Sequence, residues 1–274
     1  MEHNARQTGT FIATKEHRRF EEFANAVRKH RYIGLCYGAA GVGKTLSARR
    51  YAHWDLAEPF LKEWRRDDPA NDETCAALAR SRTVFYTPTV SGTLRDLRET
   101  LEVCIIRVQS CIDDHLHRGQ TECRVVKNDG LVEMLIFDEA ERLSMNALEF
   151  IRDIFDRTDV GVILTGMPGM EKRLSRYPQF YSRVGFAHHY RALAGEELSF
   201  VLTRHWRSLG IHLDNADFTD ATAVASIARL TGGNFRLLHR LFVQIERIMK
   251  INDLTVITDD VVEAARSTLV IGVN

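Results

Sequence analysis

The sequence lacks the features that mark membrane, secreted or zinc-stabilised proteins. No apolar run approaches the roughly 20 residues that a membrane-spanning helix requires, and the N-terminal stretch MEHNARQTGTF is polar where a secretory signal would be apolar. The cysteines number 5, an odd count, and none has C-x-x-C spacing. We therefore expect a cytoplasmic protein without membrane association or a disulfide framework, whose cysteines are mostly small buried hydrophobes.

The chain also lacks a net charge, since 37 basic residues balance 37 acidic ones. This balance neither indicates nor excludes a nucleic-acid partner, because a basic strip can lie opposite an acidic face. Lysine is scarce, with 7 lysines against 30 arginines. Arginine is the better partner for phosphates and for contacts across subunits, although the base composition of a genome would produce the same bias.

Short apolar runs alternate with helical patterns through the first two thirds of the chain. The runs predict strands at 32–37, 83–90, 132–139, 160–167 and 185–193. The helical patterns predict helices at 14–30, 44–57, 93–116 and 144–158. Thr14 is the expected N-cap of the first helix, and the polar stretch 63–74, which contains Pro69, is expected to be a loop. The alternation predicts an α/β core with a mostly parallel sheet and helices on both faces.

Strand patterns disappear after Ala194, and the remaining sequence has helical periodicity. The expected helices here cover 195–210, 217–233, 234–250 and 258–270. We therefore expect an α/β nucleotide-binding core at 1–194 and a small helical lid domain at 195–274.

The most informative motif is GAAGVGKT at 38–45, which matches G-x-x-x-x-G-K-[ST]. It follows a predicted strand and opens a predicted helix, the context in which this motif binds nucleotide phosphates. Lys44 is expected to reach the β- and γ-phosphates of ATP, and Thr45 to ligate Mg²⁺. The expected nucleotide-binding residues of the loop are Gly38, Ala39, Ala40, Gly41, Val42, Gly43, Lys44, Thr45 and Leu46.

A second motif, MLIFDE at 134–139, is an apolar strand that ends in two carboxylates. The carboxyl ends of parallel strands meet at one edge of the sheet, so these acids are expected beside the phosphate loop. Asp138 is expected to hold the Mg²⁺ shell with Thr45, and Glu139 to position or polarise the attacking water. The second acid favours hydrolysis over a pure nucleotide switch.

Polar residues elsewhere could complete a catalytic site. Thr165 ends the strand at 160–167 and could bind the γ-phosphate or the attacking water, or it is a threonine exposed by chance. Arg236, in the stretch GGNFRLLHRL, could reach the γ-phosphate from the lid, or it is an ordinary exposed helix residue. Arg176 and Arg183 precede the last core strand, and we expect one of them, Arg183 by preference, to act in a neighbouring subunit as an arginine finger.

These motifs occur in an order that resembles an AAA+ ATPase over about residues 10–270. Within that superfamily, YIGLCYGAAGVGKTLSARRYA and LVEMLIFDEAERL look like the transposition regulators of the TniB, TnsC and MuB type. The resemblance implies ATP-dependent binding to double-stranded DNA as a homo-oligomeric ring or helical filament. It also implies partners, namely a transposase and a targeting adaptor protein. The chain departs from MuB in having no helix-turn-helix pattern ahead of the core, so DNA contacts would come from the core itself.

The resemblance places the DNA-facing elements between the second and third core strands, at 91–99 and 117–127. The expected phosphate contacts there are Thr93, Arg95, Arg98, Arg118, Thr121 and Lys127. The alternative is that RDLRE is simply the solvated face of an amphipathic helix. His188 and His189 are neighbours in a predicted strand and point to opposite faces, so we do not expect them to chelate one metal.

Two other functions remain open from the sequence. A protein-directed AAA+ motor, such as a secretion-system ATPase, would need an aromatic and hydrophobic pore loop after the second strand, where this chain has TPTVSGTLRD. A non-hydrolysing nucleotide-gated scaffold, for example in phage defence, would not need Glu139.

Overall fold

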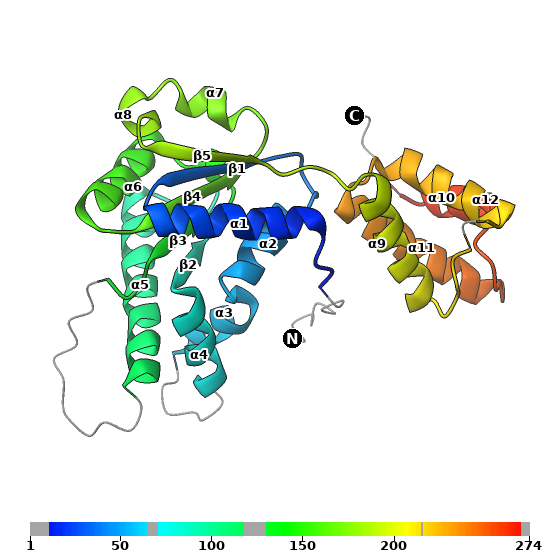
Figure 1. Ribbon diagram of the computed structural model, residues 1–274, viewed down its shortest axis with the longest axis horizontal. Coiled ribbons are helices and arrows are strands. Elements are labelled where there is room, and N and C mark those ends of the chain that lie inside the picture. The colour runs from blue at the N-terminus through cyan, green and yellow to red at the C-terminus, as the bar shows by residue number, and fades with distance from the viewer. Residues whose placement is uncertain (1–10, 65–70, 118–129, 215, 270–274) are drawn as a thin grey trace. The chain divides into compact units, whose positions relative to one another are not determined.

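The computed structural model describes residues 11–64, 71–117, 130–214 and 216–269, and these form two compact units (Figure 1). The larger unit spans residues 19–190, and the smaller unit combines residues before 19 with those from 191 onward. The segment 11–18 thus groups with the helical unit. The domain limits expected from the sequence, 1–194 and 195–274, stay a prediction.

The larger unit is an α/β fold built on a five-stranded sheet in which every neighbouring pair is parallel. The strand order is β2-β3-β4-β1-β5, and helices lie on both faces (Figure 1). The strands are β1 (Ile33–Tyr37), β2 (Thr83–Tyr86), β3 (Met134–Phe137), β4 (Gly161–Gly166) and β5 (Val184–His189). The predicted fold class and all five predicted strands are confirmed.

Burial explains why these strands appear as apolar runs. Every residue of β3 and β4 is buried because helices cover both faces of the sheet centre. The edge strand β5 instead alternates between half-buried and exposed residues. The predicted strand at 83–90 is shorter than expected, since pairing with β3 ends at Tyr86.

The helices of the larger unit differ from the prediction in two places. The helices and the short 3₁₀ turn are α1 (Lys15–His30), α2 (Lys44–Tyr51), α3 (Trp54–Glu63), α4 (Asn71–Ser81), α5 (Leu94–Leu116), η1 (Ala140–Arg142), α6 (Met145–Arg157), α7 (Met170–Leu174) and α8 (Pro178–Tyr181). The single helix expected at 44–57 is wrong, because His53 adopts a left-handed conformation with φ 51° and separates α2 from α3. The loop expected at 63–74 is also partly wrong, because α4 begins inside it.

Helix caps agree with the sequence signals. The Thr14 hydroxyl accepts a hydrogen bond from the His17 amide at 3.1 Å, which confirms the predicted N-cap of α1. Thr93 and Asp96 form a reciprocal capping box at the start of α5. Ser144 caps α6 through a single hydrogen bond, which its hydroxyl accepts from the Ala147 amide at 3.2 Å.

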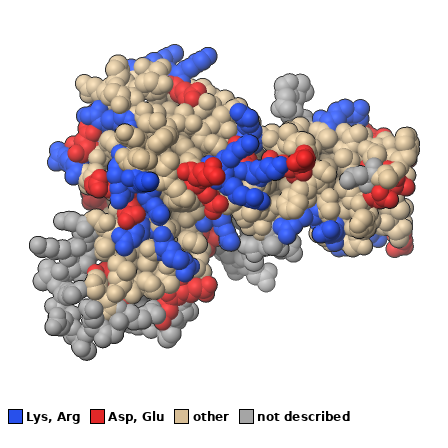
Figure 2. All heavy atoms as spheres, viewed as in Figure 1, with Lys and Arg blue, Asp and Glu red and all other residues tan. Residues whose placement is uncertain are grey.

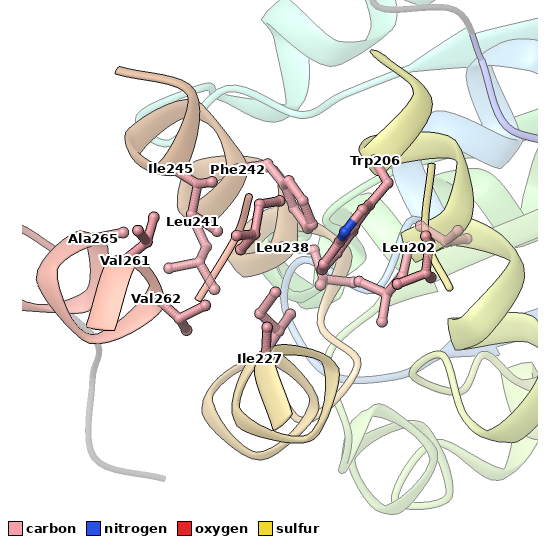
Figure 3. Close-up of a cluster of buried hydrophobic side chains, with 14 of the residues drawn as sticks. Leu202, Trp206, Ile227, Leu238, Leu241, Phe242, Ile245, Val261, Val262 and Ala265 are labelled. Atoms are coloured by element: carbon pink, nitrogen blue, oxygen red, sulfur yellow. The ribbon is translucent and has the colours of Figure 1, made fainter. Parts of the chain in front are cut away.

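The smaller unit is helical, and its four helices enclose a core of their own (Figure 3). They are α9 (Gly195–Ser208), α10 (Phe218–Thr231), α11 (Phe235–Ile251) and α12 (Asp259–Ser267). Trp206 is fully buried here, and its indole N–H donates to Asp220 Oδ1 at 3.3 Å. This hydrogen bond satisfies the one polar atom of the indole inside an apolar core.

His205 gives the smaller unit an acid sensitivity. Its ring stacks on Phe242 with centroids 4.3 Å apart, and its buried Nε2 has no hydrogen-bond partner. Burial, with a smaller contribution from His239, lowers the pKa of His205 to about 4. The folded unit therefore disfavours the protonated ring, and stability is lost as pH falls from the unfolded pKa near 6.5 toward 4.

We predict that His205→Leu removes this loss. Between pH 7.5 and pH 5.0, the wild-type unit should lose about 2 kcal/mol more unfolding free energy than the variant. Urea unfolding followed by Trp206 fluorescence, in a background with Trp54→Phe and Trp64→Phe, measures this difference. Parallel pH profiles in wild type and variant would contradict the assignment.

Candidate nucleotide-binding site

The phosphate loop occupies the carboxyl edge of the sheet, between β1 and α2. Gly41 and Gly43 have φ values of 79° and 116°, in the left-handed region that glycine tolerates. The Gly38 amide donates to the carbonyl of Gly166 at 3.3 Å, which fastens the start of the loop to the end of β4. The helix α2 then begins at Lys44, so its N-terminus faces the loop.

Lys44 folds back over this loop. Its ammonium donates to the carbonyls of Gly38 at 2.7 Å and Ala39 at 2.8 Å, and only 9% of the residue is exposed. A bound phosphate would offer this ammonium charged acceptor oxygens, which form stronger hydrogen bonds than carbonyls do. The loop residues predicted from the sequence therefore lie together, with Val42 buried and Leu46 half exposed on the first turn of α2.

Hydrogen bonds beside the loop join the first turn of α2 to the ends of two strands, β3 and β4. The Thr45 hydroxyl donates to Asp138 Oδ2 at 2.7 Å, and the Thr165 hydroxyl donates to Asp138 Oδ1. Asp138 is 3% exposed and Thr165 is fully buried. The parallel order β3-β4-β1 produces this meeting, because it places the three carboxyl ends side by side.

The Thr45 hydroxyl and the Asp138 carboxylate are hard oxygen ligands of the kind that Mg²⁺ prefers, so the residues present fit this ion. When bound, Mg²⁺ would neutralise charge on the phosphate oxygens. Thr165 was expected to face the γ-phosphate or the attacking water. In the structure its hydroxyl instead orients Asp138, and its catalytic role stays a prediction.

Glu139 follows Asp138 but points to a different environment. Its φ of 48° turns the chain out of β3, and its carboxylate forms an ion pair with Arg142. Arg142 also donates to the carbonyl of Pro88 at 3.0 Å, in the loop after β2. The Glu139 side chain is 41% exposed, so solvent reaches the carboxylate that the sequence predicts to act on water.

The two arginine-finger candidates differ in whether an acidic residue of the same chain holds the guanidinium group. Arg183 is held by Asp156 through contacts of 2.5 and 2.7 Å, and this hydrogen bonding lowers the pKa of the Asp156 carboxyl. Arg176 is exposed and forms no ion pair with any residue that the structure describes. Arg183 lies just before the start of β5, at the amino edge of the sheet. The phosphate loop of the same chain lies at the carboxyl edge. The preference for Arg183 stays a prediction, and the structure makes Arg176 the less restrained of the two.

Arg236 belongs to the smaller unit and lies in the first turn of α11. Asn234 caps this helix by accepting from the Arg236 amide at 3.1 Å, and the Arg236 side chain is exposed. This placement fits both interpretations of the residue, so its predicted contact with a γ-phosphate stays a prediction.

The expected DNA contacts are only partly described by the structure. Arg95 is exposed and pairs with Glu99 at 2.7 Å, while the exposed Arg98 lies over the ring of Phe150. The Thr93 hydroxyl is engaged with Asp96 in the capping box. Three further candidates lie outside the described residues, namely Arg118, Thr121 and Lys127.

In one view of the larger unit, charged side chains do not form a single patch of one sign that would mark a docking surface. Basic and acidic side chains are interspersed there (Figure 2). A nucleic acid on that face would therefore meet local groups of basic side chains rather than one continuous basic field.

The placement of two histidines and the burial of the cysteines agree with the expectations from the sequence. His188 stacks on Phe23 and His189 stacks on Tyr37, which confirms that they lie on opposite faces of β5. Cys36, Cys75 and Cys111 are buried, and burial raises the pKa of Cys104 to about 12. Within the described ranges, no cluster of His, Cys, Asp or Glu has the form of a metal site, and no helix is long and apolar enough to cross a membrane.

Sequence reasoning missed Tyr190 and Ser47 behind the loop and Arg142 beside Glu139. The Tyr190 hydroxyl and Ser47 Oγ are hydrogen-bonded at 2.8 Å. None of the three belongs to a motif with fixed spacing. The only signal for Arg142 was its position three residues after Glu139, which is the spacing of a helical ion pair.

A phosphate loop at the edge of a parallel sheet, beside a hydroxyl–carboxylate pair, defines a P-loop nucleotide-binding protein. The AAA domain family matches residues 27–174, and the chain belongs to this family. It is 42% identical over 275 residues to a "Potential ATP-binding protein" of Staphylococcus aureus, covering 96% of this chain and 97% of that one. The chain is therefore an ATP-binding protein of the AAA type.

Solved structures support the fold. The Thermotoga maritima RuvB Holliday junction branch migration motor matches with a TM-score of 0.55 and 17% identity, over 93% of this chain and 68% of that chain. The Aeropyrum pernix ORC2 protein in its ADPNP-ADP complexes matches with a TM-score of 0.55 and 15% identity, over 94% and 70%. At such identities the likeness concerns the AAA+ P-loop fold alone.

We predict that Lys44→Ala weakens ATP binding at least about 100-fold, because it removes the ammonium that lies over the loop. Titration calorimetry with ATP and Mg²⁺ measures the affinity. Lys172→Ala, which removes an exposed lysine of the same unit, is the matched control and should bind like wild type. Equal affinities for the two variants would show that the nucleotide binds elsewhere.

Proposed function

We propose that this protein is a cytoplasmic ATPase that binds double-stranded DNA with little sequence preference. It assembles into homo-oligomers on target DNA, and it recruits or regulates a transposase, in some systems through a targeting adaptor. The observation that carries the enzymatic part is the Thr45–Asp138–Thr165 hydrogen-bond chain, with Glu139 next along the sequence. Beside the phosphate loop, which would hold the nucleotide, these groups would supply an Mg²⁺ ligand pair and a carboxylate that water can reach.

Two observations support DNA as the partner, namely the resemblance of the sequence motifs and the exposure of two arginines. The phosphate loop and acidic strand motifs resemble those of the TniB, TnsC and MuB regulators. Arg95 and Arg98 are exposed at the start of α5, where that resemblance puts the DNA-facing elements. A solved structure with the same fold is described as a Holliday junction branch migration motor, and a Holliday junction is DNA. Contacts of this kind, to phosphates, would give affinity without sequence preference.

One observation favours the alternative, a protein-directed motor. Val90 is 83% exposed in the loop between β2 and α5. An exposed apolar residue at this place could contact a polypeptide. However, residues 87–93 hold no aromatic side chain and are otherwise mostly polar, so the loop suits a phosphate backbone better.

ATP turnover with and without duplex DNA separates the candidates. We expect double-stranded DNA to stimulate the wild-type rate, and we expect steep loss of DNA affinity with salt. An ATP hydrolysis rate that DNA does not change would favour the protein-directed motor. Absence of ATP hydrolysis would favour a nucleotide-gated scaffold.

Glu139→Gln tests the hydrolytic part of the proposal. The amide keeps the shape of the side chain but cannot accept a proton, so turnover should fall at least about 100-fold while ATP still binds. DNA-bound assemblies should then persist, which fluorescence anisotropy of labelled duplex will show as slow dissociation. Turnover at the wild-type rate would refute the role of Glu139.

Separate substitutions of Arg183 and Arg176 test which of them acts as the arginine finger. Arg183→Ala is expected to retain ATP affinity and lose DNA-stimulated hydrolysis, because a finger acts on the nucleotide of a neighbouring subunit. Arg176→Ala is the comparison, and Arg157→Ala, which breaks only an exposed pair with Asp153, is the control. Loss of turnover in the Arg176 variant alone would move the finger to that residue. Loss in neither would exclude both.

A further inference from the structure

Tyr190 lies behind the phosphate loop and contacts both elements that the loop joins. Its amide donates to the carbonyl of Tyr37 at 2.8 Å, so the chain after β5 stays fastened to the end of β1. Its hydroxyl and Ser47 Oγ, on α2, are hydrogen-bonded at 2.8 Å. With only 4% of the residue exposed, Tyr190 bridges the two ends of the loop from the protein interior.

The glycines of the loop are packed against the same residue. A Cβ added at Gly38 would lie 2.2 Å from the Tyr190 carbonyl oxygen, which is closer than atoms can approach. A Cβ added at Gly43 would lie 3.3 Å from the Tyr190 hydroxyl. The first and last glycines of the motif therefore have a structural reason besides phosphate access, since Tyr190 fills the space where side chains would be.

Tyr190 is also the last residue of the larger unit. Three residues further along, within the smaller unit, the Leu193 amide donates to the carbonyl of Gly233 at 3.0 Å. A Cβ on Gly233 would lie 1.9 Å from the Leu193 carbonyl oxygen, so this contact is close-packed too. Gly233 precedes Asn234, the cap of the helix that carries Arg236.

Only Arg191 and Ala192 separate these two anchored residues. The covalent chain therefore links the back of the phosphate loop to the turn before α11.

We propose that Tyr190 is a positioning residue of the phosphate loop. This inference rests on the proposed nucleotide binding. Ordering of the loop around phosphates restrains α2 and the end of β1, and both are attached to Tyr190. The Tyr190 hydroxyl and Ser47 act as one unit in this arrangement.

Nucleotide affinity tests the positioning role through Tyr190→Phe, Ser47→Ala and the double variant. Each single substitution should weaken ATP binding about five-fold, and the double variant should be no weaker than either, because both break the same hydrogen bond. Tyr51→Phe is the matched control, since the Tyr51 hydroxyl donates to Asn25 Oδ1 at 2.8 Å away from the loop. Wild-type affinity in Tyr190→Phe, or multiplying effects in the double variant, would overturn the positioning role.

Hydrogen exchange without nucleotide gives an independent readout. Amides of residues 38–47 should exchange several-fold faster in Tyr190→Phe than in wild type or Tyr51→Phe, while those of α5 stay unchanged. Equal exchange in the three proteins would overturn the inference. If wild type bound no ATP, the proposed function would fail, and this comparison would still decide whether Tyr190 holds the loop.

Discussion

The hydrogen bond between Thr45 and Asp138 is the contact on which the site depends. It joins the first turn of α2 to the end of β3, two elements separated by 93 positions in the sequence. The sheet makes this contact possible by placing β4 between β3 and β1 with all strands parallel. Thr165, at the end of β4, then fixes the second oxygen of the same carboxylate. The ends of β3 and β4 and the first turn of α2 thus hold one acid beside the phosphate loop, where a divalent ion and a triphosphate would need it.

Two residues, Arg142 and Tyr190, connect the nucleotide site with neighbouring segments of the chain. Arg142 contacts both Glu139 and the carbonyl of Pro88, so the proposed water-activating acid is tied to the loop before α5. On the other side of the phosphate loop, Tyr190 leads within three residues to an anchor in the helical unit. The first of these links joins the nucleotide site to the loop before α5, where the proposed function places contacts with DNA.

Much of the fold could be predicted from the sequence because its signals are local. Buried parallel strands appear as apolar runs, and the phosphate loop has fixed spacing, so all five strands and the loop were placed correctly. The break between α2 and α3 could not be predicted, because His53 takes a left-handed conformation that histidine itself does not require. Tyr190 and Ser47 lie 143 positions apart, and no local pattern predicts a hydroxyl pair brought together by folding. The same limit applies to Arg183, whose pairing with Asp156 depends on how α6 packs.

The central claim is that ATP lets copies of this chain assemble along duplex DNA. Electron microscopy of the purified protein with duplex DNA and Mg²⁺, with and without ATP, tests it most directly. The account predicts rings or helical filaments on the duplex when ATP is present and bare DNA when it is absent. Single particles and bare DNA under both conditions would contradict it.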